Sequence, residues 1–513
     1  MRTYLPLIAF LLVGCCLSAP DTTFIYTYGG KGYAEGRSVQ QTNDGGYIMA
    51  GSTGSFGLGN SDIYVVKVDS FGKYQWSKSY GGAYTDQGLS VKQTNDTGYI
   101  IAGYTNSFGA GGYDVYLVKT DSLGDTLWTK TYGGIDWDFG YSVVQTTDGG
   151  YAVAGETYSF GAGGNDVYMI KTNANGDTLW TKTYGGSNAD FGRSIQITFD
   201  GGFIMGGGTA SFGSGKLDAY AVRTSSNGDT LWTNTFGGAE DDFANAIIQT
   251  LDTGYAFIGT TESYGAGAKD GYFLKMNKNG SFSWFQTYLG NVNDEGKDLI
   301  QLTNGNFVLL GYTENTGLPP NFIFYITDKD GWSFIGLGFG SISYDDFGYS
   351  IIARKKGGFA LFGTTNGYGV GLTDFYLITT DSNGHDFSGN IYANFAPGVA
   401  FEDTNIAVIV SSDKLLILNN TQIIIYPNPV IQAVTIELFT PLINYNFNGL
   451  NFALYNLFGQ KVKEINNHGS KKLTFNRSDL LDGIYFYRIV VTQKDVSNQN
   501  GEIFSGKITL VSE

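Results

Sequence analysis

The sequence predicts an all-β protein: a seven-bladed β-propeller with four-stranded blades and a 52-residue repeat, followed by a small C-terminal β-sandwich. Three observations support this prediction. A similar segment returns seven times at a constant interval. Each copy contains four short strand-like runs, and no stretch shows the 3.6-residue apolar spacing of an amphipathic helix. Glycine (75 of 513 residues) and aromatic residues (15 %) are abundant, which is typical of many strands joined by tight turns and not of disorder.

The repeat is clearest in a segment of the type SVxQT. An aspartate stands four residues before this segment in six of the seven copies. The segment begins at Ser38, Ser90, Ser142, Ser194, Ala246, Asp298 and Ser350. The preceding positions are Ala34, Asp86, Asp138, Asp190, Asp242, Asp294 and Asp346. A fixed period of this length is typical of a repeat array or a propeller.

One unit, residues 138–184, shows the expected elements in order. It contains the strand-like runs YSVVQT, YAVAGE, DVYMIKT and TLWTKTY. The turns TDGG and NANGD join the first run to the second and the third to the fourth, and their glycines tolerate the positive φ angles of tight hairpins. A longer loop joins the second run to the third. Closing seven such units into a ring leaves only short, protected sheet edges.

The fourth run of each unit is expected to be the outermost strand, with a tryptophan that wedges between neighbouring blades. Five units have this residue at the 52-residue spacing: Trp76, Trp128, Trp180, Trp232 and Trp284. Ile335 replaces it in unit six, where Trp332 lies in the preceding turn, and Ser388 replaces it in unit seven. Phe24 stands one period before the first tryptophan. We therefore expect Phe24–Tyr28 to pair with the seventh blade and close the ring; the alternative is a leader to blade one.

The first 19 residues have the features of an export signal: Arg2 followed by an apolar run through about Leu17. The segment LVGC at 12–15 resembles a bacterial lipobox, in which Cys15 would be lipidated. The alternative is ordinary cleavage near Ser18 or Ala19. After this signal we expect the propeller at 20–395, a connector at 396–420 and a second domain at 421–513.

Charge and histidine content argue against several classes of function. A formal net charge of −16 repels phosphate backbones and anionic lipids, so we expect no nucleic-acid partner and no role at a membrane surface. The two histidines, His385 and His468, have no neighbouring set of partner residues in the sequence. Serine–histidine–aspartate catalysis and histidine-based zinc sites therefore find no support.

An aspartate also opens the third run of six units. The set is Asp62, Asp114, Asp166, Asp218, Asp270 and Asp374, with Asn321 in unit six. Such carboxylates could form a ring of calcium ligands. We expect instead that each accepts backbone N–H bonds in its own loop, as short acidic side chains do at turns. The sequence thus predicts no metal or cofactor, with calcium as the alternative.

The repeats resemble bacterial β-propeller repeats that pair a DDxxxAI segment with GxxYxxGxT, DxFxxKxDxxG and WxxxxGG. This resemblance extends from residue 24 to about residue 395. It implies the fold and carries little information on function, because propellers host enzymes, lectins and scaffolds alike.

The C-terminal region contains alternating apolar runs that suit a small β-sandwich, in IIIYPNPVIQAVTIEL, ALYNLFGQKV, LLDGIYFYRI and GKITLVSE. Together these runs resemble the C-terminal sorting domain of proteins exported by the type IX (Por) secretion system of Bacteroidota. The matching positions are Tyr426, Pro427, Asn428, Pro429, the turn 459–462, Gly483, Ile484, Tyr485, Gly506 and Lys507. The resemblance implies the type IX machinery as a partner and passage across the outer membrane. It also implies that this domain is often removed and the protein attached to a surface polysaccharide; an unrelated binding sandwich is the alternative.

A ligand is expected on the propeller face with the longer loops, since strand connections alternate between the two faces. Positions that vary inside a strict repeat are the best candidates, because packing does not fix them. The blade-to-blade loops offer Tyr33, Tyr84, Trp137 and Asp241. Just before the first strands stand Arg37, Tyr141, Arg193, Lys297 and Tyr349. Exposed aromatic rings beside a few charges suit carbohydrate stacking or peptide capture.

The sequence therefore predicts an exported protein, secreted or displayed on the outer cell surface, that binds or adheres through its long-loop face without catalysis. Its ligand would be a glycan or a protein. One alternative is a hydrolase or lyase acting on polysaccharide, with Glu262 and Glu314 as paired carboxylates on neighbouring blades. Another alternative is a structural surface component without a specific ligand.

Overall fold

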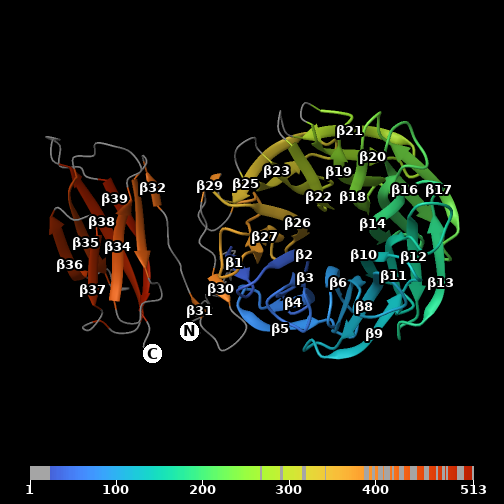
Figure 1. Cartoon of the computed structure of the whole chain (residues 1–513). Coiled ribbons are helices and arrows are strands. Elements are labelled where there is room, and N and C mark those ends of the chain that lie inside the picture. The colour runs from blue at the N-terminus through green and yellow to red at the C-terminus, as the bar shows by residue number, and fades with distance from the viewer. Residues whose placement is uncertain are drawn as a thin grey trace, which may run out of the picture.

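The computed structural model describes residues 23–385 except 266–267, 289–292, 315–318 and 341–342, and it describes Leu480 and the strands after residue 385 that are named below. Residues 23–385 form seven β-sheets around a central axis (Figure 1). The predicted all-β fold with seven four-stranded blades is confirmed. Within the described residues, no helix is long and apolar enough to cross a membrane.

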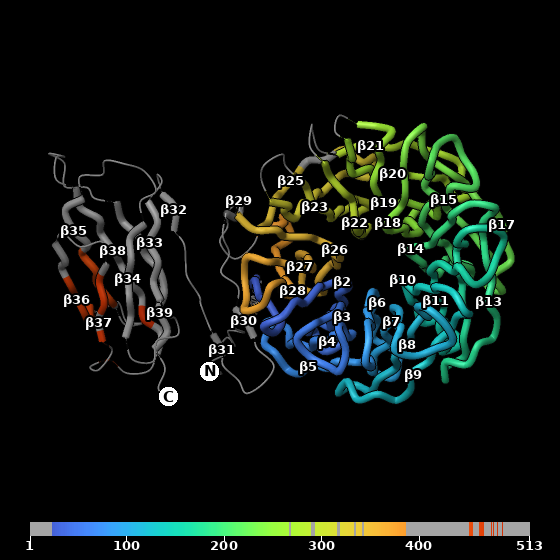
Figure 2. Tube along the Cα trace, viewed as in Figure 1, coloured from blue at the N-terminus to red at the C-terminus, as the bar shows by residue number. Residues whose placement is uncertain are grey.

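Each of blades one to six is built from four consecutive antiparallel strands, the first nearest the axis and the fourth on the outside (Figures 1 and 2). Blade one contains β2 (Ala34–Gln41), β3 (Tyr47–Thr53), β4 (Asp62–Val68) and β5 (Tyr74–Tyr80). Blade two contains β6 (Asp86–Gln93), β7 (Tyr99–Thr105), β8 (Asp114–Thr120) and β9 (Thr126–Tyr132). Blade three contains β10 (Asp138–Gln145), β11 (Tyr151–Thr157), β12 (Asp166–Thr172) and β13 (Thr178–Tyr184).

The remaining blades follow the same order. Blade four contains β14 (Asp190–Ile197), β15 (Phe203–Thr209), β16 (Asp218–Thr224) and β17 (Thr230–Phe236). Blade five contains β18 (Asp242–Gln249), β19 (Tyr255–Thr261), β20 (Asp270–Met276) and β21 (Phe282–Tyr288). Blade six contains β22 (Asn293–Gln301), β23 (Phe307–Glu314), β24 (Asn321–Thr327) and β25 (Ser333–Gly340). Blade seven contains β26 (Asp346–Ala353), β27 (Phe359–Thr365) and β28 (Asp374–Thr379).

The fourth strand of blade seven comes from the other end of the propeller sequence. Strand β1 (Ile25–Tyr28) pairs antiparallel with β28, with Ile25 opposite Ile378 and Tyr28 opposite Phe375. The backbone N–H of Thr379 donates to the Phe24 carbonyl at 2.8 Å. The predicted ring closure by Phe24–Tyr28 is therefore confirmed.

The tryptophans of the fourth strands of blades one to five lie between blades, as predicted. The ring centroid of Trp76, on β5, is 5.7 Å from that of Tyr99, on β7 of the next blade. A Cβ atom at Gly124, in the last turn of that next blade, would lie 2.7 Å from the same indole. Glycine is required there for space, and its φ of +80° also favours glycine. The recurring tryptophan and turn glycine thus form one inter-blade contact.

Polar residues of the SVxQT segment also join neighbouring blades. The Ser38 hydroxyl accepts the N–H of Val91 in the next blade at 3.2 Å. The Gln93 side-chain carbonyl accepts the N–H of Asn43, in the first turn of the preceding blade, at 2.8 Å. Across the closure, the Ser350 hydroxyl accepts the N–H of Val39 at 3.4 Å. The repeat therefore preserves a hydrogen-bond pattern that is completed between blades.

Three short strands after residue 385 extend the propeller sheets. Strand β29 (Tyr392–Asn394) pairs in parallel with β25 of blade six. Strand β30 (Val399–Phe401) pairs in parallel with β1, and β31 (Val408–Ile409) pairs with β30. The segment expected as a connector at 396–420 thus contributes two strands to the sheet of blade seven.

The C-terminal region contains two further four-stranded sheets. The first has the order β32 (Leu416–Leu418), β33 (Thr421–Tyr426), β34 (Ala433–Phe439) and β37 (Lys472–Asn476). The second has the order β36 (Lys461–His468), β35 (Phe447–Tyr455), β38 (Gly483–Gln493) and β39 (Glu502–Leu510). Leu473 of the first sheet and Phe452, Leu454 and Tyr485 of the second are buried. Face-to-face packing of the two sheets as a sandwich stays a prediction.

Candidate functional site

The first strands of all seven blades enclose a cavity of 410 Å³ along the axis. Each of these strands contains a β-bulge, as between Gly36 and Ser38 on β2, so that one residue has no partner on the neighbouring strand. A bulge bends its strand and re-aims the side chain of the extra residue. All seven bulge residues line the cavity: Arg37, Leu89, Tyr141, Arg193, Asn245, Lys297 and Tyr349. These positions lie inside the first strands, not before them as the sequence suggested.

Three of the bulge residues are cations, and each lies over an aromatic ring. The distances from charge to ring centroid are 4.3 Å for Arg37 over Tyr349, 5.4 Å for Arg193 over Tyr141 and 5.2 Å for Lys297 over Tyr312. Such cation–π contacts hold the charged groups in place without neutralising them. The first strands run inward from the long-loop face, and each bulge residue is the first residue of its strand to line the cavity, so the three cations lie at the long-loop end of the cavity.

The three cations differ in how their charge is compensated. Arg37 forms an ion pair with Glu35 at 2.9 Å, and Lys297 forms one with Glu295. Arg193 has no carboxylate partner among the residues that the structure describes, and its side chain is exposed. Burial lowers the pKa of Lys297; Glu295 opposes this effect, whereas Arg193 and Arg37 lower the pKa further. The three cations therefore act on one another across the channel, and Arg193 keeps free hydrogen-bonding capacity.

A row of aromatic rings leads from the long-loop face to these cations. Trp137 is 53 % exposed, and its ring lies 6.4 Å from that of Phe139, which stacks on Tyr141 at 6.3 Å. Tyr113 and Tyr158 flank Trp137 at 6.0 and 6.1 Å. The hydroxyl of Tyr141 donates to Glu156, which fixes the ring beneath Arg193. The structure thus joins three predicted site residues, Trp137, Tyr141 and Arg193, through ring contacts.

Two other predicted residues lie outside this row. Tyr33 donates its hydroxyl to the Asn60 carbonyl at 2.9 Å and thereby braces a loop of blade one. Tyr84 is 58 % exposed, and its backbone N–H donates to the Ser107 hydroxyl at 3.0 Å. In the described part of the chain, no ring contact connects either tyrosine to Trp137.

The predicted carboxylate pair does not reach the axial cavity. Glu262 lies 3.8 Å from Lys269, and its backbone N–H donates to the Asp241 carbonyl at 2.9 Å. Glu314 ends β23 opposite Asn293 and is exposed. Neither glutamate lines the cavity.

Sequence reasoning missed an acid that does lie in the channel, Asp298. It occupies the place of the SVxQT serine on β22, and its carboxylate accepts the N–H of Ile351 at 2.9 Å, as serine does in other blades. Burial raises its pKa to about 6. Lys92, on β6, lines the same cavity; burial lowers its pKa, and the charge of Asp298 opposes that effect. The aspartate in place of the repeated serine was the sequence feature that could have indicated this acid.

The repeated aspartates serve their own loops, as expected. The Asp114 carboxylate accepts the N–H of Ala110 at 3.0 Å, and Asp86 accepts the N–H of Gly82 at 2.8 Å and the hydroxyl of Ser107 at 2.7 Å. Burial raises the pKa of Asp114, and neighbouring Asp138 contributes. Among the described residues, no group of three or more acidic, histidine or cysteine side chains could hold a metal ion. Calcium binding stays an untested alternative.

Comparison with protein families identifies the C-terminal region. Residues 424–500 match the family described as "Secretion system C-terminal sorting domain". The chain therefore ends in a type IX sorting domain, engages that secretion machinery, and is exported to the cell surface or the medium. Of the matching positions, Tyr426 ends β33, Gly483 and Tyr485 lie on β38, and Gly506 and Lys507 lie on β39. Several predicted features lie outside the described residues: the export signal 1–19 with Cys15, Ser388, Pro427, Asn428, Pro429, and Gly459 and Gln460 of the turn.

Likenesses in the propeller region are distant. The regulatory protein FlaEY of Caulobacter vibrioides is 28 % identical over 282 residues, which cover 48 % of this chain and 29 % of that protein. The chain thus spans less than a third of that relative. A puromycin hydrolase structure (TM-score 0.45, 10 % identity) covers 78 % of this chain and 58 % of its own. An endo-1,5-alpha-L-arabinanase of Thermotoga petrophila (TM-score 0.25, 13 % identity) covers 67 % and 82 %. Similarity of this kind carries no argument about function.

Proposed function

We propose that this exported propeller is a non-enzymatic binding protein that holds an anionic glycan at the long-loop end of its axial channel. The single observation that supports the proposal is the convergence of Arg37, Arg193 and Lys297 on one cavity, with Arg193 exposed and uncompensated. The whole chain has a net charge of −16, so four cations lining one channel, these three and Lys92, are a strong local departure from the surface average. A negative group of the ligand would be drawn to this point.

The chemistry of the cations indicates the negative group. A guanidinium presents a planar fork of donors that matches a carboxylate or sulfate, and such charge-assisted hydrogen bonds are stronger than neutral ones. Arg193 is already oriented by Tyr141 at 5.4 Å and by Phe191 at 5.0 Å. The loss of side-chain freedom on binding is therefore small. A uronate or sulfate ester is the group that this site suits.

The aromatic row favours a sugar chain over a compact anion. Trp137 presents an exposed ring at the long-loop face, and the row continues through Phe139 to Tyr141. A sugar ring has an apolar C–H face that can lie on such a ring while its hydroxyls stay in water. An acidic peptide is the competing ligand, and it would use the same cations without requiring Trp137.

A polysaccharide-acting hydrolase or lyase is the second candidate, favoured by Asp298. A carboxyl group whose pKa is about 6 is suited to give and take protons near neutral pH. Two carboxylates next to the cavity-lining cations, Glu35 and Glu295, do not line the cavity and are paired with Arg37 and Lys297. Glycoside cleavage requires two carboxylates, and Asp298 is the one acidic residue among the described residues that line the cavity. Binding is therefore the better supported function.

The test is a glycan array probed with the secreted protein. Replacing Arg193→Ala should weaken binding to uronate- or sulfate-bearing glycans about 10-fold or more, the effect of about 1.5–3 kcal/mol for a hydrogen bond to a charged group. Trp137→Ala should weaken binding to the same glycans. The matched control is Lys216→Ala, an exposed cation of the long loops that pairs with Glu240.

Other outcomes of this experiment identify the alternatives. Binding to acidic peptides that is indifferent to Trp137→Ala would favour a protein ligand. Shortening of a bound polysaccharide that stops in Asp298→Asn would favour the hydrolase. If the protein binds no glycan and no peptide, the result would favour a structural surface component without a specific ligand. We also propose, from the sorting domain, that the propeller is anchored to surface polysaccharide after the sorting domain is removed; the mass of the surface-extracted protein tests this.

A further inference from the structure

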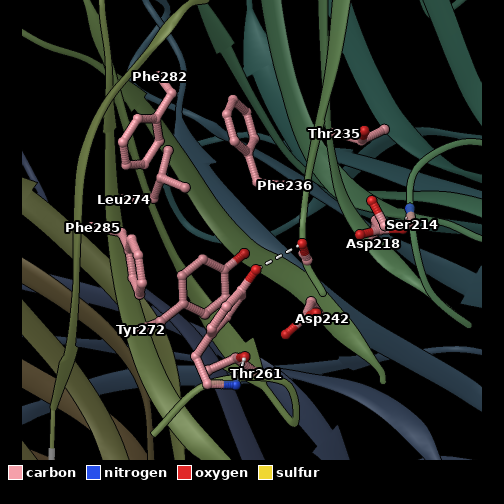
Figure 3. A pocket seen from close by; sticks show the side chains of 12 residues that line it. Ser214, Asp218, Thr235, Phe236, Asp242, Thr261, Tyr272, Leu274, Phe282 and Phe285 are labelled. Carbon is pink, nitrogen blue, oxygen red and sulfur yellow. Dashed lines mark hydrogen bonds between the residues drawn. The ribbon is translucent and has the colours of Figure 1, made fainter. Parts of the chain in front are cut away.

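A second cavity, of 320 Å³, lies between blades four and five (Figure 3). Its walls come from β16 and β17 of blade four, from all four strands of blade five (β18 to β21), and from the loops that contain Ser214 and Tyr264. Two sequence departures distinguish this junction from its counterparts between earlier blades. Both departures replace a hydrogen-bonding side chain with phenylalanine.

The first departure is at the end of the fourth strand. In blades one to three this residue is a tyrosine whose hydroxyl donates to the carbonyl of a turn glycine in the next blade. The pairs are Tyr80 with Gly124 (2.7 Å), Tyr132 with Gly176 (2.6 Å) and Tyr184 with Gly228 (2.7 Å). Blade four has Phe236, and Asn234 donates to the Gly280 carbonyl at 2.9 Å in its place. The carbonyl is therefore satisfied, whereas the hydroxyl that the other junctions have is missing.

The second departure is in the middle of the fourth strand of blade five. In blades two to four, a threonine at this position hydrogen-bonds to the tyrosine of the third strand. The pairs are Thr129 with Tyr116, Thr181 with Tyr168 and Thr233 with Tyr220. Blade five has Phe285 instead, and the hydroxyl of Tyr272 consequently has no partner among the described residues although Tyr272 is only 5 % exposed. Buried hydroxyls are nearly always hydrogen-bonded in folded proteins.

The cavity has one aromatic side and one acidic side. Figure 3 shows Phe236, Phe282 and Phe285 with Leu274 on one side, and Asp218 and Asp242 on the other. One carboxylate oxygen of Asp242 accepts the Gly238 N–H (2.7 Å) and the Ser263 hydroxyl (2.6 Å). Its second oxygen is buried and has no partner in the described structure. The unpartnered hydroxyl of Tyr272 and the unpartnered oxygen of Asp242 thus both belong to residues of the wall of this cavity, and both atoms are buried.

We propose that this cavity binds one neutral sugar ring, as a second glycan subsite independent of the anionic group held in the axial channel. The C–H face of the sugar lies against Phe285 and Phe236, and its hydroxyls donate to Asp242 and exchange a hydrogen bond with Tyr272. The volume is at the lower end of small-molecule sites, which suits a single ring.

Charge excludes an anionic ring from this site. Besides Asp218 and Asp242, the loops at this junction carry Glu240 and Glu262, which are balanced by Lys216 and Lys269. Burial raises the pKa of the Tyr272 hydroxyl well above its usual value, and Asp242 and Asp218 add to the effect. The hydroxyl is therefore neutral at physiological pH, and the two carboxylates beside it repel a uronate. The preferred ligand is thus neutral, whereas that of the axial channel is anionic.

The experiment measures saturation-transfer NMR from the full secreted protein to single methyl glycosides of glucose, galactose, mannose and N-acetylglucosamine. We expect transfer to at least one of these probes. Tyr272→Phe removes only the unpartnered hydroxyl and should raise the Kd about 10-fold. Phe285→Thr restores the residue of the earlier blades, gives Tyr272 a partner and removes one wall, so transfer should vanish.

The matched control is Tyr220→Phe at the same position of blade four, where Thr233 already occupies the hydroxyl. Transfer should be unchanged in this variant. Thermal melting checks folding, and Tyr272→Phe should melt no lower than the parent protein because it removes an unsatisfied buried group. No transfer to any neutral glycoside, transfer unchanged by both blade-five variants, or transfer to phenol in place of sugars would each overturn the proposal.

Discussion

Replacing Asp298 with asparagine should stabilise the propeller above pH 6 and alter how its stability depends on pH. Burial raises the pKa of this carboxyl from 3.8 to about 6. The folded state therefore holds the proton more tightly than the unfolded state. The stabilisation from this proton is complete below pH 3.8 and is lost as the pH rises through about 6. One pKa unit corresponds to about 1.4 kcal/mol, so the ionised group costs about 3 kcal/mol at pH 8.

Lys92 reduces the expected gain. Its charge opposes the rise in the pKa of Asp298, and the lysine itself loses a counter-charge in Asp298→Asn. We therefore expect a gain of about 1–3 kcal/mol at pH 8 and no gain at pH 4, since the protonated Asp298 of the folded parent and the asparagine of the variant are then both neutral. The amide also still has a carbonyl oxygen for the N–H of Ile351.

The assay is thermal melting followed by tryptophan fluorescence between pH 4 and pH 8. The difference in melting temperature between Asp298→Asn and the parent should grow from pH 4 to about pH 7 and then level off. The control is Asp330→Asn, an exposed turn acid next to Lys329, which should give a constant difference. A constant difference for Asp298→Asn as well, or a larger loss at pH 8 than at pH 4, would refute the reasoning.

Three further predictions concern the tryptophan between blades, the stability at low pH and the export of the protein. Trp128→Ala should destabilise the protein by about 2–4 kcal/mol, because the indole lies against Tyr151 at 5.9 Å and over Gly176; chemical denaturation measures this, with the exposed Leu123→Ala as control. Asp148, whose pKa is lowered to about 2, stabilises the fold above pH 4 and ceases to do so as the pH falls through 2, so Asp148→Asn should flatten an acid-denaturation profile there. Deleting residues 421–513 should retain the protein inside the cell, as a blot of cell and medium fractions would show; undiminished surface display would contradict the assignment.

The constant period was sufficient to predict the blades, the closure and the tryptophan wedge. The reason is physical: hydrogen bonds such as that from Val91 to Ser38 connect equivalent positions of adjacent units, so the pattern must recur for the ring to close. Closure by Phe24–Tyr28 followed from the same periodicity, because Phe24 stands one period before a tryptophan.

The axial site could be predicted only in part. The repeat showed that the positions of Arg37 and Arg193 vary. It did not show the β-bulge at these positions, because a bulge is a backbone feature and the bulge residues here are as different as arginine, leucine, tyrosine and asparagine. Convergence of the three cations on one cavity therefore had to come from the structure. The charge of Asp298 was visible, yet its burial beside Lys92 was not.

In a strict repeat, each unit can be compared with the equivalent positions of the other units. Where one unit departs from the others, the lost interaction can be named: Phe285 removes the partner of Tyr272, and Asp298 introduces a charge where serine makes the same backbone bond. Each departure lowers stability relative to the neighbouring blades, because a buried group is left unsatisfied or ionised. Restoring the repeat with Phe285→Thr or Asp298→Ser should thus raise the melting temperature. If the same variants also bind their ligand less tightly, the departures are retained for binding at the expense of stability. A lower melting temperature in either variant would contradict the statement that the departures destabilise the fold.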